Sequence, residues 1–264
     1  MSEVISPIRR FARLTARYAA VAYAVATCLL DYLVNALSGK TSLIHRAGVL
    51  HRRCGQLLPR LGVSLVSQGP VPDTGMVVSN HLSYLDIVVF SAIAPCVFVS
   101  KREVRSWLGI GWVASLAGCI YIDRSRQQGT HDVQPQMAAT LAGGVRVILF
   151  AEGTSSDGRQ VLPIRSSLFQ PAVTDRVPIT AACIRYEIED GDPAIDVCYY
   201  GDHVIGPHSM KVFARNDVKA VVRFGATTKI FTDRKQAASE LYEQVNALKD
   251  QSAVEVSRVA TAVV

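Results

Sequence analysis

Several common signatures are missing from this sequence of 264 residues. Its six cysteines are scattered, no two of them form a C-x-x-C pair, and several lie in apolar runs where cysteine usually acts as a small hydrophobic residue. No internal repeat with a period of about 20 to 50 residues is present. We therefore expect no disulfide framework, no metal site and no solenoid, and a protein that faces a reducing cytoplasm.

Acidic residues are scarce at one end of the chain. Residues 1–60 carry nine basic side chains against only Glu3 and Asp31, a net charge of +7, so the other 204 residues contribute −1 to the total of +6. A basic balance confined to one end argues against a body that binds nucleic acid. It favours an end that meets an anionic surface such as a phospholipid membrane.

That end also lacks an unbroken apolar run of membrane-spanning length. Residues 18–30 form thirteen uncharged positions, whereas a spanning helix needs about 20 apolar residues. The run fits a signal peptide, a core helix, or a helix in or on a membrane with the preceding arginines at the lipid phosphates: Arg9, Arg10, Arg13 and Arg17. Residues 41–61 combine helical apolar spacing with a basic side, which fits a membrane-facing helix or a solvated helix packed on the main domain.

Beyond residue 61, short β-branched runs alternate with helical patterns. This alternation predicts an α/β fold, a layered sheet flanked by helices, at 62–250. A basic amphipathic helical membrane-associating segment at 1–61 precedes it, and a frayed tail at 251–264 follows. Strands are predicted at 76–79, 96–100, 119–123, 145–150, 177–184, 195–200 and 218–224, and helices at 87–94, 104–116, 134–142 and 233–249.

Four of the predicted strands end in polar clusters. "NHLSYLD" (80–86) follows the first strand, and later strands lead into Lys101, into Arg124 and into "EGTSSDG" from Glu152. Ligands of α/β sheets bind outside the carboxyl ends of the strands, so we expect these four exits to form one site.

The histidine of the first cluster stands five positions before an aspartate. If His81 lies just outside the helix that contains Asp86, the carboxylate can fix the imidazole tautomer and make His81 a general base. A capped helix start with a satisfied histidine would show the same pattern. Metal binding is disfavoured because no second His or Cys stands at ligand spacing. Ser83 lacks the G-x-S-x-G elbow that presents a nucleophilic serine.

The turn at Glu152 is short, flanked by glycine and rich in hydroxyls. Its backbone N–H groups can face an anion, and Lys101 and Arg124 add charge for a phosphate or oxyanion pocket. An ordinary polar turn has the same composition. No G-K-[ST] follows this turn, so ATP is not implied.

Taken together, these residues resemble the glycerolipid acyltransferase family, typified by 1-acyl-sn-glycerol-3-phosphate acyltransferase. That family is marked by N-H-x4-D, matched here by Asn80, His81 and Asp86. Its strand ending in I-D-R matches "GCIYIDR" (118–124), its F-P-E-G-T-R block matches 150–154 with departures, and its V-P-I strand matches 177–179. The blocks agree in order over most of the chain.

The resemblance implies a mechanism and a location. His81, oriented by Asp86, would take the proton from a hydroxyl of a lysolipid, whose oxygen attacks the thioester of acyl-CoA or acyl carrier protein. These donors are co-substrates, and no cofactor is implied. Family members sit on the membrane, which implies the cytoplasmic face of the inner membrane. The acceptor or the developing oxyanion would be held by Asn80, Lys101, Arg124, Glu152, Gly153 and Thr154.

Two departures from the family pattern affect the expected substrate. Ala151 replaces a proline, and Ser155 replaces an arginine that is associated with the acceptor phosphate in members that form phosphatidic acid. Arg165 either substitutes for the missing charge or has a structural role. The acceptor therefore stays open between 1-acylglycerol-3-phosphate, a related lysophospholipid and a lyso-ornithine lipid. A lipid hydrolase or thioesterase, and a membrane-binding module without catalysis, are the alternatives of other classes.

Overall fold

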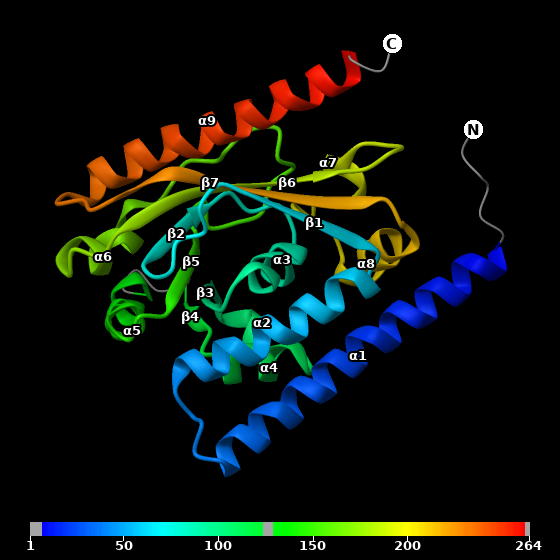
Figure 1. Cartoon of the computed structure of the whole chain (residues 1–264), viewed down its shortest axis with the longest axis horizontal. Helices are drawn as coiled ribbons and strands as arrows, with labels where there is room; N and C mark the ends of the chain where they lie inside the picture. The colour runs from blue at the N-terminus through cyan, green and yellow to red at the C-terminus, as the bar shows by residue number, and fades with distance from the viewer. Residues whose placement is uncertain (1–6, 124–128, 262–264) are drawn as a thin grey trace.

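A mixed sheet of seven strands forms the centre of the molecule (Figure 1). The computed structural model describes residues 7–123 and 129–261, with side chains over 7–123 and 133–251. The strand order is β1-β7-β6-β2-β5-β3-β4, and all neighbours are parallel except β6 and β7. The predicted α/β class is confirmed. The strands are β1 (Val63–Gln68), β2 (Met76–Ser79), β3 (Cys96–Lys101), β4 (Ile120–Ile122), β5 (Arg146–Phe150), β6 (Ile179–Glu187) and β7 (Val218–Lys229).

Helices cover both faces of the sheet. One face carries α5 (Gly129–Ala142), α6 (Gln170–Thr174) and α9 (Arg234–Thr261), and the other carries α2 (Leu43–Arg60), α3 (Leu85–Ile93) and α8 (Ile205–Ala214). Successive strand side chains point to opposite faces, so Met76 and Val78 enter one core while Val77 enters the other. Short elements complete the chain: η1 (Arg102–Ser106), α4 (Ile110–Ala117), η2 (Ser166–Phe169) and α7 (Pro193–Asp196).

The N-terminal segment is a hairpin of two helices, α1 (Pro7–Leu37) and α2, on the side of the sheet opposite α9 (Figure 1). The inner face of α1 packs through Ala24, Cys28 and Tyr32, in contact with α2, α4 and α8. Its outer face is exposed. Within the described residues, α1 is the one helix that is long and apolar enough to cross a membrane, a statement about length and composition only.

Two of the arginines expected at lipid phosphates are used inside the protein instead. Arg13 donates to the Ala214 carbonyl at 2.7 Å, and Arg17 donates to the Phe213 carbonyl at 2.8 Å. Arg17 is only 4% exposed and also bonds the Arg215 carbonyl. These two side chains therefore join α1 to the end of α8, because a buried guanidinium requires acceptors that lipid cannot supply here.

Several elements differ from their sequence-based bounds. Residues 195–200, expected as a strand, begin inside α7, where Asp192 caps the helix by accepting from the Ala194 N–H and Pro193 occupies the first turn. The helix expected over 104–116 is divided before Gly109, whose φ is +72°. α9 continues to Thr261, through residues expected to be frayed, and contains no proline or glycine that would end it sooner. β1 and α8 were not predicted.

Candidate active site

The first and last of the four strand exits lie side by side at the carboxyl edge of the sheet. β2 and β5 are parallel neighbours with Ser79 opposite Phe150, so His81 and Glu152 each follow the end of their strand by two residues. The Ser156 N–H donates to the His81 carbonyl at 2.9 Å, which ties the two loops together. The sheet topology thus brings together residues about seventy positions apart in the sequence.

A hydrogen bond joins His81 to Asp86. Asp86 lies in the first turn of α3, and its Oδ2 accepts from His81 Nδ1 at 2.7 Å and from the backbone N–H of Leu82 at 2.7 Å and of Ser83 at 3.1 Å. Because an ionised carboxylate only accepts, Nδ1 carries the proton and the Nε2 lone pair is free. The His81 side chain is 22% exposed whereas that of Asp86 is fully buried, so the imidazole is the member of the pair that a substrate can reach.

Two aromatic residues that the sequence analysis missed hold this pair in place. The Tyr186 hydroxyl donates to Asp86 Oδ1 at 2.6 Å, and the Phe150 ring stacks on the imidazole with centroids 4.2 Å apart. Burial and the neighbouring Asp86 charge raise the pKa of Tyr186 well above its ordinary value, so it stays a donor. Tyr186 is separated from Asp86 by 100 positions, and no local pattern links them.

The side chain of Asn80 bonds to the backbone of a neighbouring strand. It is buried, its side-chain amide donates to the Ile184 carbonyl at 2.9 Å, and its Oδ1 accepts from the Ile184 N–H at 2.8 Å. These two bonds continue the β2–β6 ladder beyond its last backbone pair, Ser79 with Ala182. Both polar ends of the side chain are therefore engaged with backbone, and the expected contact of Asn80 with substrate stays a prediction.

The Glu152 carboxylate hydrogen-bonds to the backbone of two loops. Its carboxylate accepts from the His81 N–H at 3.2 Å and from the Leu162 N–H at 3.0 Å, and the residue is 5% exposed. Burial raises the pKa of the Glu152 carboxyl to about 7, against the lowering effect of these N–H donors. These two hydrogen bonds fix the backbone on either side of the site, and the expected contact of Glu152 with an acceptor stays a prediction.

Ser83 is placed where it cannot act as a nucleophile. It is fully buried, and its Oγ has no hydrogen-bond partner among the described residues. The Asp86 contact is made by the serine backbone and not by its hydroxyl. Ser83 is therefore disfavoured as the hydroxyl that reacts at this histidine. Nor do three His, Cys, Asp or Glu side chains gather as metal ligands within the described part of the chain.

The chain has named relatives over most of the domain that contains this site. The acyltransferase family model matches residues 65–185. A lyso-ornithine lipid O-acyltransferase of Brucella abortus (strain 2308) is 33% identical over 189 residues, which are 66% of this chain and 70% of that protein. The chain belongs to the acyltransferase family.

Further relatives of this acyltransferase carry a second name. The 1-acyl-sn-glycerol-3-phosphate acyltransferase of Neisseria gonorrhoeae is 33% identical over 120 residues, so the matched region covers only 46% of this chain and 47% of that protein. The crystal structure of a 1-acyl-sn-glycerophosphate (LPA) acyltransferase from Thermotoga maritima superimposes with a TM-score of 0.67, covering 93% of this chain and 97% of that one. Their identity is 17%, so this likeness shows a shared fold.

The other residues expected in the site differ in where the structure places them. Gly153 takes a φ of +79° in the turn after Glu152, and Thr154 is exposed. Lys101 is exposed at the end of β3 and makes no described contact with the His81 pair. Arg124 lies outside the described residues. Ser155 is partly exposed, and the Arg165 N–H donates to the Ala151 carbonyl at 3.1 Å, which brings exposed Arg165 beside the Glu152 turn.

Proposed function

We propose that this acyltransferase moves a fatty acyl group from acyl-CoA or acyl carrier protein to the free hydroxyl of a lysolipid. One observation carries the proposal: an oriented histidine base, His81 on Asp86, stands at the sheet edge, and the serine of the same motif, Ser83, is fully buried. Such a base activates a hydroxyl that arrives with the substrate. Membership of the family and the names of the relatives support the same conclusion.

The reaction proceeds in one displacement. His81 Nε2 accepts the proton of the acceptor hydroxyl while its oxygen attacks the thioester carbonyl of the donor. The C–S bond then breaks, the thiolate takes a proton from the imidazolium, and the ester and free thiol leave. The fully hydrogen-bonded Asp86 carboxylate stabilises the imidazolium between these steps.

We propose a lysolipid with a free hydroxyl as the class of acceptor. Within that class, a lyso-ornithine lipid is favoured over 1-acylglycerol-3-phosphate. Ser155 stands where members that form phosphatidic acid have an arginine, and the lyso-ornithine relative of Brucella matches over more of its length than the Neisseria relative does. Arg165 is the cation that an acceptor phosphate could still reach beside the Glu152 turn.

The membrane is the proposed source of both lipids. The outer face of α1 exposes Leu30, Leu33 and Leu37, and α4 exposes Trp112 next to it. An amphipathic helix with such a face lies in the interface plane of a bilayer. We propose that the hairpin of residues 1–61 rests on the cytoplasmic face of the inner membrane, with the domain of residues 62–250 above it.

The decisive experiment assays purified protein with one labelled acyl donor against lysolipids with and without a phosphate. We expect His81→Ala to lower acyl transfer by at least about 100-fold, since general base catalysis contributes on the order of 10²–10⁴-fold. Ser83→Ala should keep most of the activity and the stability, because its hydroxyl has no partner to lose. Equal loss of acyl transfer in both variants would favour a hydrolase with a serine nucleophile. Retained acyl transfer in His81→Ala would contradict the proposed role of His81 as the general base.

Arg165→Ala resolves the acceptor within the same assay. If a phosphate acceptor is held by Arg165, this variant loses transfer to 1-acylglycerol-3-phosphate while transfer to a lyso-ornithine lipid is unchanged. Substantial transfer by the unmodified protein to 1-acylglycerol-3-phosphate and none to the lyso-ornithine lipid would contradict the favoured candidate.

A further inference from the structure

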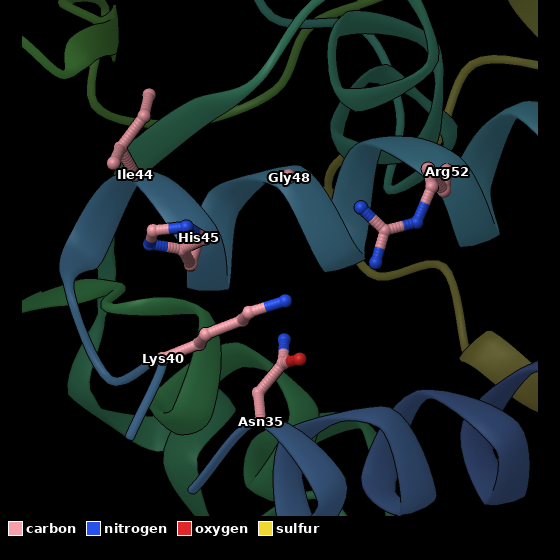
Figure 2. A pocket seen from close by; sticks show the side chains of 6 residues that line it. All are labelled: Asn35, Lys40, Ile44, His45, Gly48 and Arg52. Atoms are coloured by element: carbon pink, nitrogen blue, oxygen red, sulfur yellow. The ribbon is translucent and has the colours of Figure 1, made fainter. Parts of the chain in front are cut away.

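A polar cavity lies between the two helices of the N-terminal hairpin, away from the active site. Its volume is about 300 Å³, and it opens where the last turns of α1 diverge from the first half of α2 (Figure 2). Figure 2 shows Lys40 and Asn35 extending from the α1 end into the space below α2, with the Arg52 guanidinium hanging toward it from the other end. The lining residues are Asn35, Lys40, Ile44, His45, Gly48 and Arg52.

The cavity is cationic and lacks a compensating acid. In the described part of the chain, Lys40 and Arg52 make no ion pair, and the nearby Asp31 is bound in a two-point contact by Arg53 at 2.9 Å. The first turn of α2 also contains no acidic residue, so its partial positive charge adds to that of the side chains. Cations held around one space with no carboxylate are the arrangement that recognises an anion.

Space is left at the cavity wall by a glycine. Glycine inside a helix costs about 1 kcal/mol relative to alanine, and Gly48 lies in the middle of α2. A Cβ at this position would meet nothing closer than the Arg52 guanidinium at 3.7 Å. The packing of the fold therefore does not require glycine here, and the position adds no side chain to the cavity wall.

The level at which the cavity would lie in the membrane points to its occupant. Packed helices lie about 8–10 Å apart, so if the outer face of α1 enters the acyl-chain boundary, the gap between α1 and α2 lies some 5 Å above the α1 axis. That is the level of lipid phosphates. Ile44 is exposed at the cavity and offers apolar surface that a free anion would not use.

We infer that this cavity binds the phosphate of an anionic phospholipid, a lipid that is neither donor nor acceptor in the reaction. Lys40 and Arg52 supply the charge, and Asn35 and His45 supply hydrogen-bonding groups. Ser42 hydrogen-bonds the His45 ring at 2.5 Å and fixes its position. The inference rests on the proposed membrane placement of α1 but not on the identity of the acceptor.

The test compares binding of the full chain to vesicles of phosphatidylcholine alone and of phosphatidylcholine with 30 mole per cent phosphatidylglycerol, a composition of about the usual anionic content. The variant is Lys40→Gln with Arg52→Gln. Its matched control is Lys235→Gln with Arg176→Gln, which removes the same charge from exposed side chains of α9 and the end of α6, far from the hairpin (Figure 1).

We expect the cavity variant to lose about tenfold in affinity for the anionic vesicles, with binding to phosphatidylcholine vesicles unchanged and the control unaffected. Equal losses in variant and control would overturn the inference, since they would reflect net charge alone. No loss in either would also overturn it. Ten millimolar inorganic phosphate, about the anion concentration that a weak site requires, separates the sources at equal ionic strength: full competition would assign the site to free phosphate rather than lipid.

Acyl transfer in detergent separates this inference from the proposed function. Both double variants should keep the activity of the unmodified protein there, because none of the four residues contacts the His81 site. A protein that is inactive in detergent without any substitution would refute the proposed function and leave the vesicle result to be judged on its own.

Discussion

At the scale of single residues, the site consists of one exposed imidazole held by side chains and backbone that do not themselves react. Asp86 accepts four hydrogen bonds, from His81, Leu82, Ser83 and Tyr186, and is thereby fixed in one orientation. His81 and Asn80 are neighbours in the same motif, but their side chains have different surroundings. The His81 ring is partly exposed, whereas both polar atoms of the neighbouring Asn80 side chain form hydrogen bonds with strand β6.

Asn80→Ala tests this division of tasks. The substitution leaves the Ile184 N–H and carbonyl buried without partners, so we expect the free energy of unfolding to fall by about 2–3 kcal/mol. Urea denaturation measures it, and His81→Ala is the control, since loss of the partly exposed ring leaves no backbone group without its partner. A stable Asn80→Ala protein with a raised KM would show instead that Asn80 binds substrate.

Glu152 predicts a pH dependence of stability. Its folded pKa of about 7 lies above its ordinary value of 4.5, so between these pH values the folded state binds the extra proton. Stability from this group is complete below about pH 4.5 and is lost as pH rises through 7, with a slope of at most about 1.4 kcal/mol per pH unit. Glu152→Gln should remove that slope.

The measurement for Glu152 is the difference in unfolding free energy between the two proteins from pH 4.5 to pH 8. The difference should shift in favour of Glu152→Gln as pH rises and become constant above pH 7. A difference independent of pH would show that the carboxyl is not held in a buried environment. Activity of Glu152→Gln should fall moderately, because an amide cannot accept from both N–H groups as a carboxylate does.

At the scale of elements, the position of α1 depends on a contact with the start of β1. Arg17 reaches the carbonyls at the end of α8 only because Gly62, with φ +72°, leaves room for its guanidinium. The charged residue that a sequence pattern assigns to lipid is thus a structural link between the hairpin and the domain.

Gly62→Ala should loosen this link. A Cβ there collides with the Arg17 guanidinium, and the left-handed backbone conformation costs alanine a further 1–2 kcal/mol or so. Gly39→Ala is the matched control, because Gly39 has a φ of +71° and no neighbour within 4 Å. We expect Gly62→Ala to lower the unfolding free energy by at least about 2 kcal/mol more than Gly39→Ala. Equal effects would mean that Arg17 moves aside at no cost.

At the scale of the whole molecule, we propose that the hairpin sets the acyltransferase domain on the membrane. Deletion of residues 1–38 is a poor test of this arrangement, since the inner face of α1 covers parts of α2, α4 and α8. Substitutions on the outer face remove apolar contact with lipid and leave the packing intact.

Leu33→Ser with Leu37→Ser should therefore weaken binding to vesicles without lowering stability. Both side chains are largely exposed, and the loss of two leucines from a lipid boundary predicts at least a tenfold drop in affinity, on the order of 1 kcal/mol or more. Ile230→Ser, at an exposed residue between β7 and α9, is the control in a flotation assay. Unchanged binding of the double variant would place the membrane contact on another face.

Local residue spacing was enough to predict the fold class and one contact of the candidate site. Alternating periodicities led to the α/β class, and six of the seven predicted strands exist, because a strand buried on both faces reads as a short apolar run whatever its neighbours are. The contact of His81 with Asp86 was also accessible, since five residues at a helix start bring the two side chains within one turn. Strand β1 and helix α8 have weaker patterns and were missed.

Contacts between distant segments depended on the fold. The order β6-β2-β5 decides that Tyr186 meets Asp86, that Asn80 bonds Ile184 and that Glu152 holds the His81 backbone. Likewise, the contact of Arg17 with the Phe213 carbonyl of α8 depends on how α1 packs in the fold and could not be predicted from the charge of Arg17. Periodicity reports which face of an element is buried but not which element covers it. The proposed general base could therefore be predicted from neighbouring residues, while the groups that hold it required the assembled sheet.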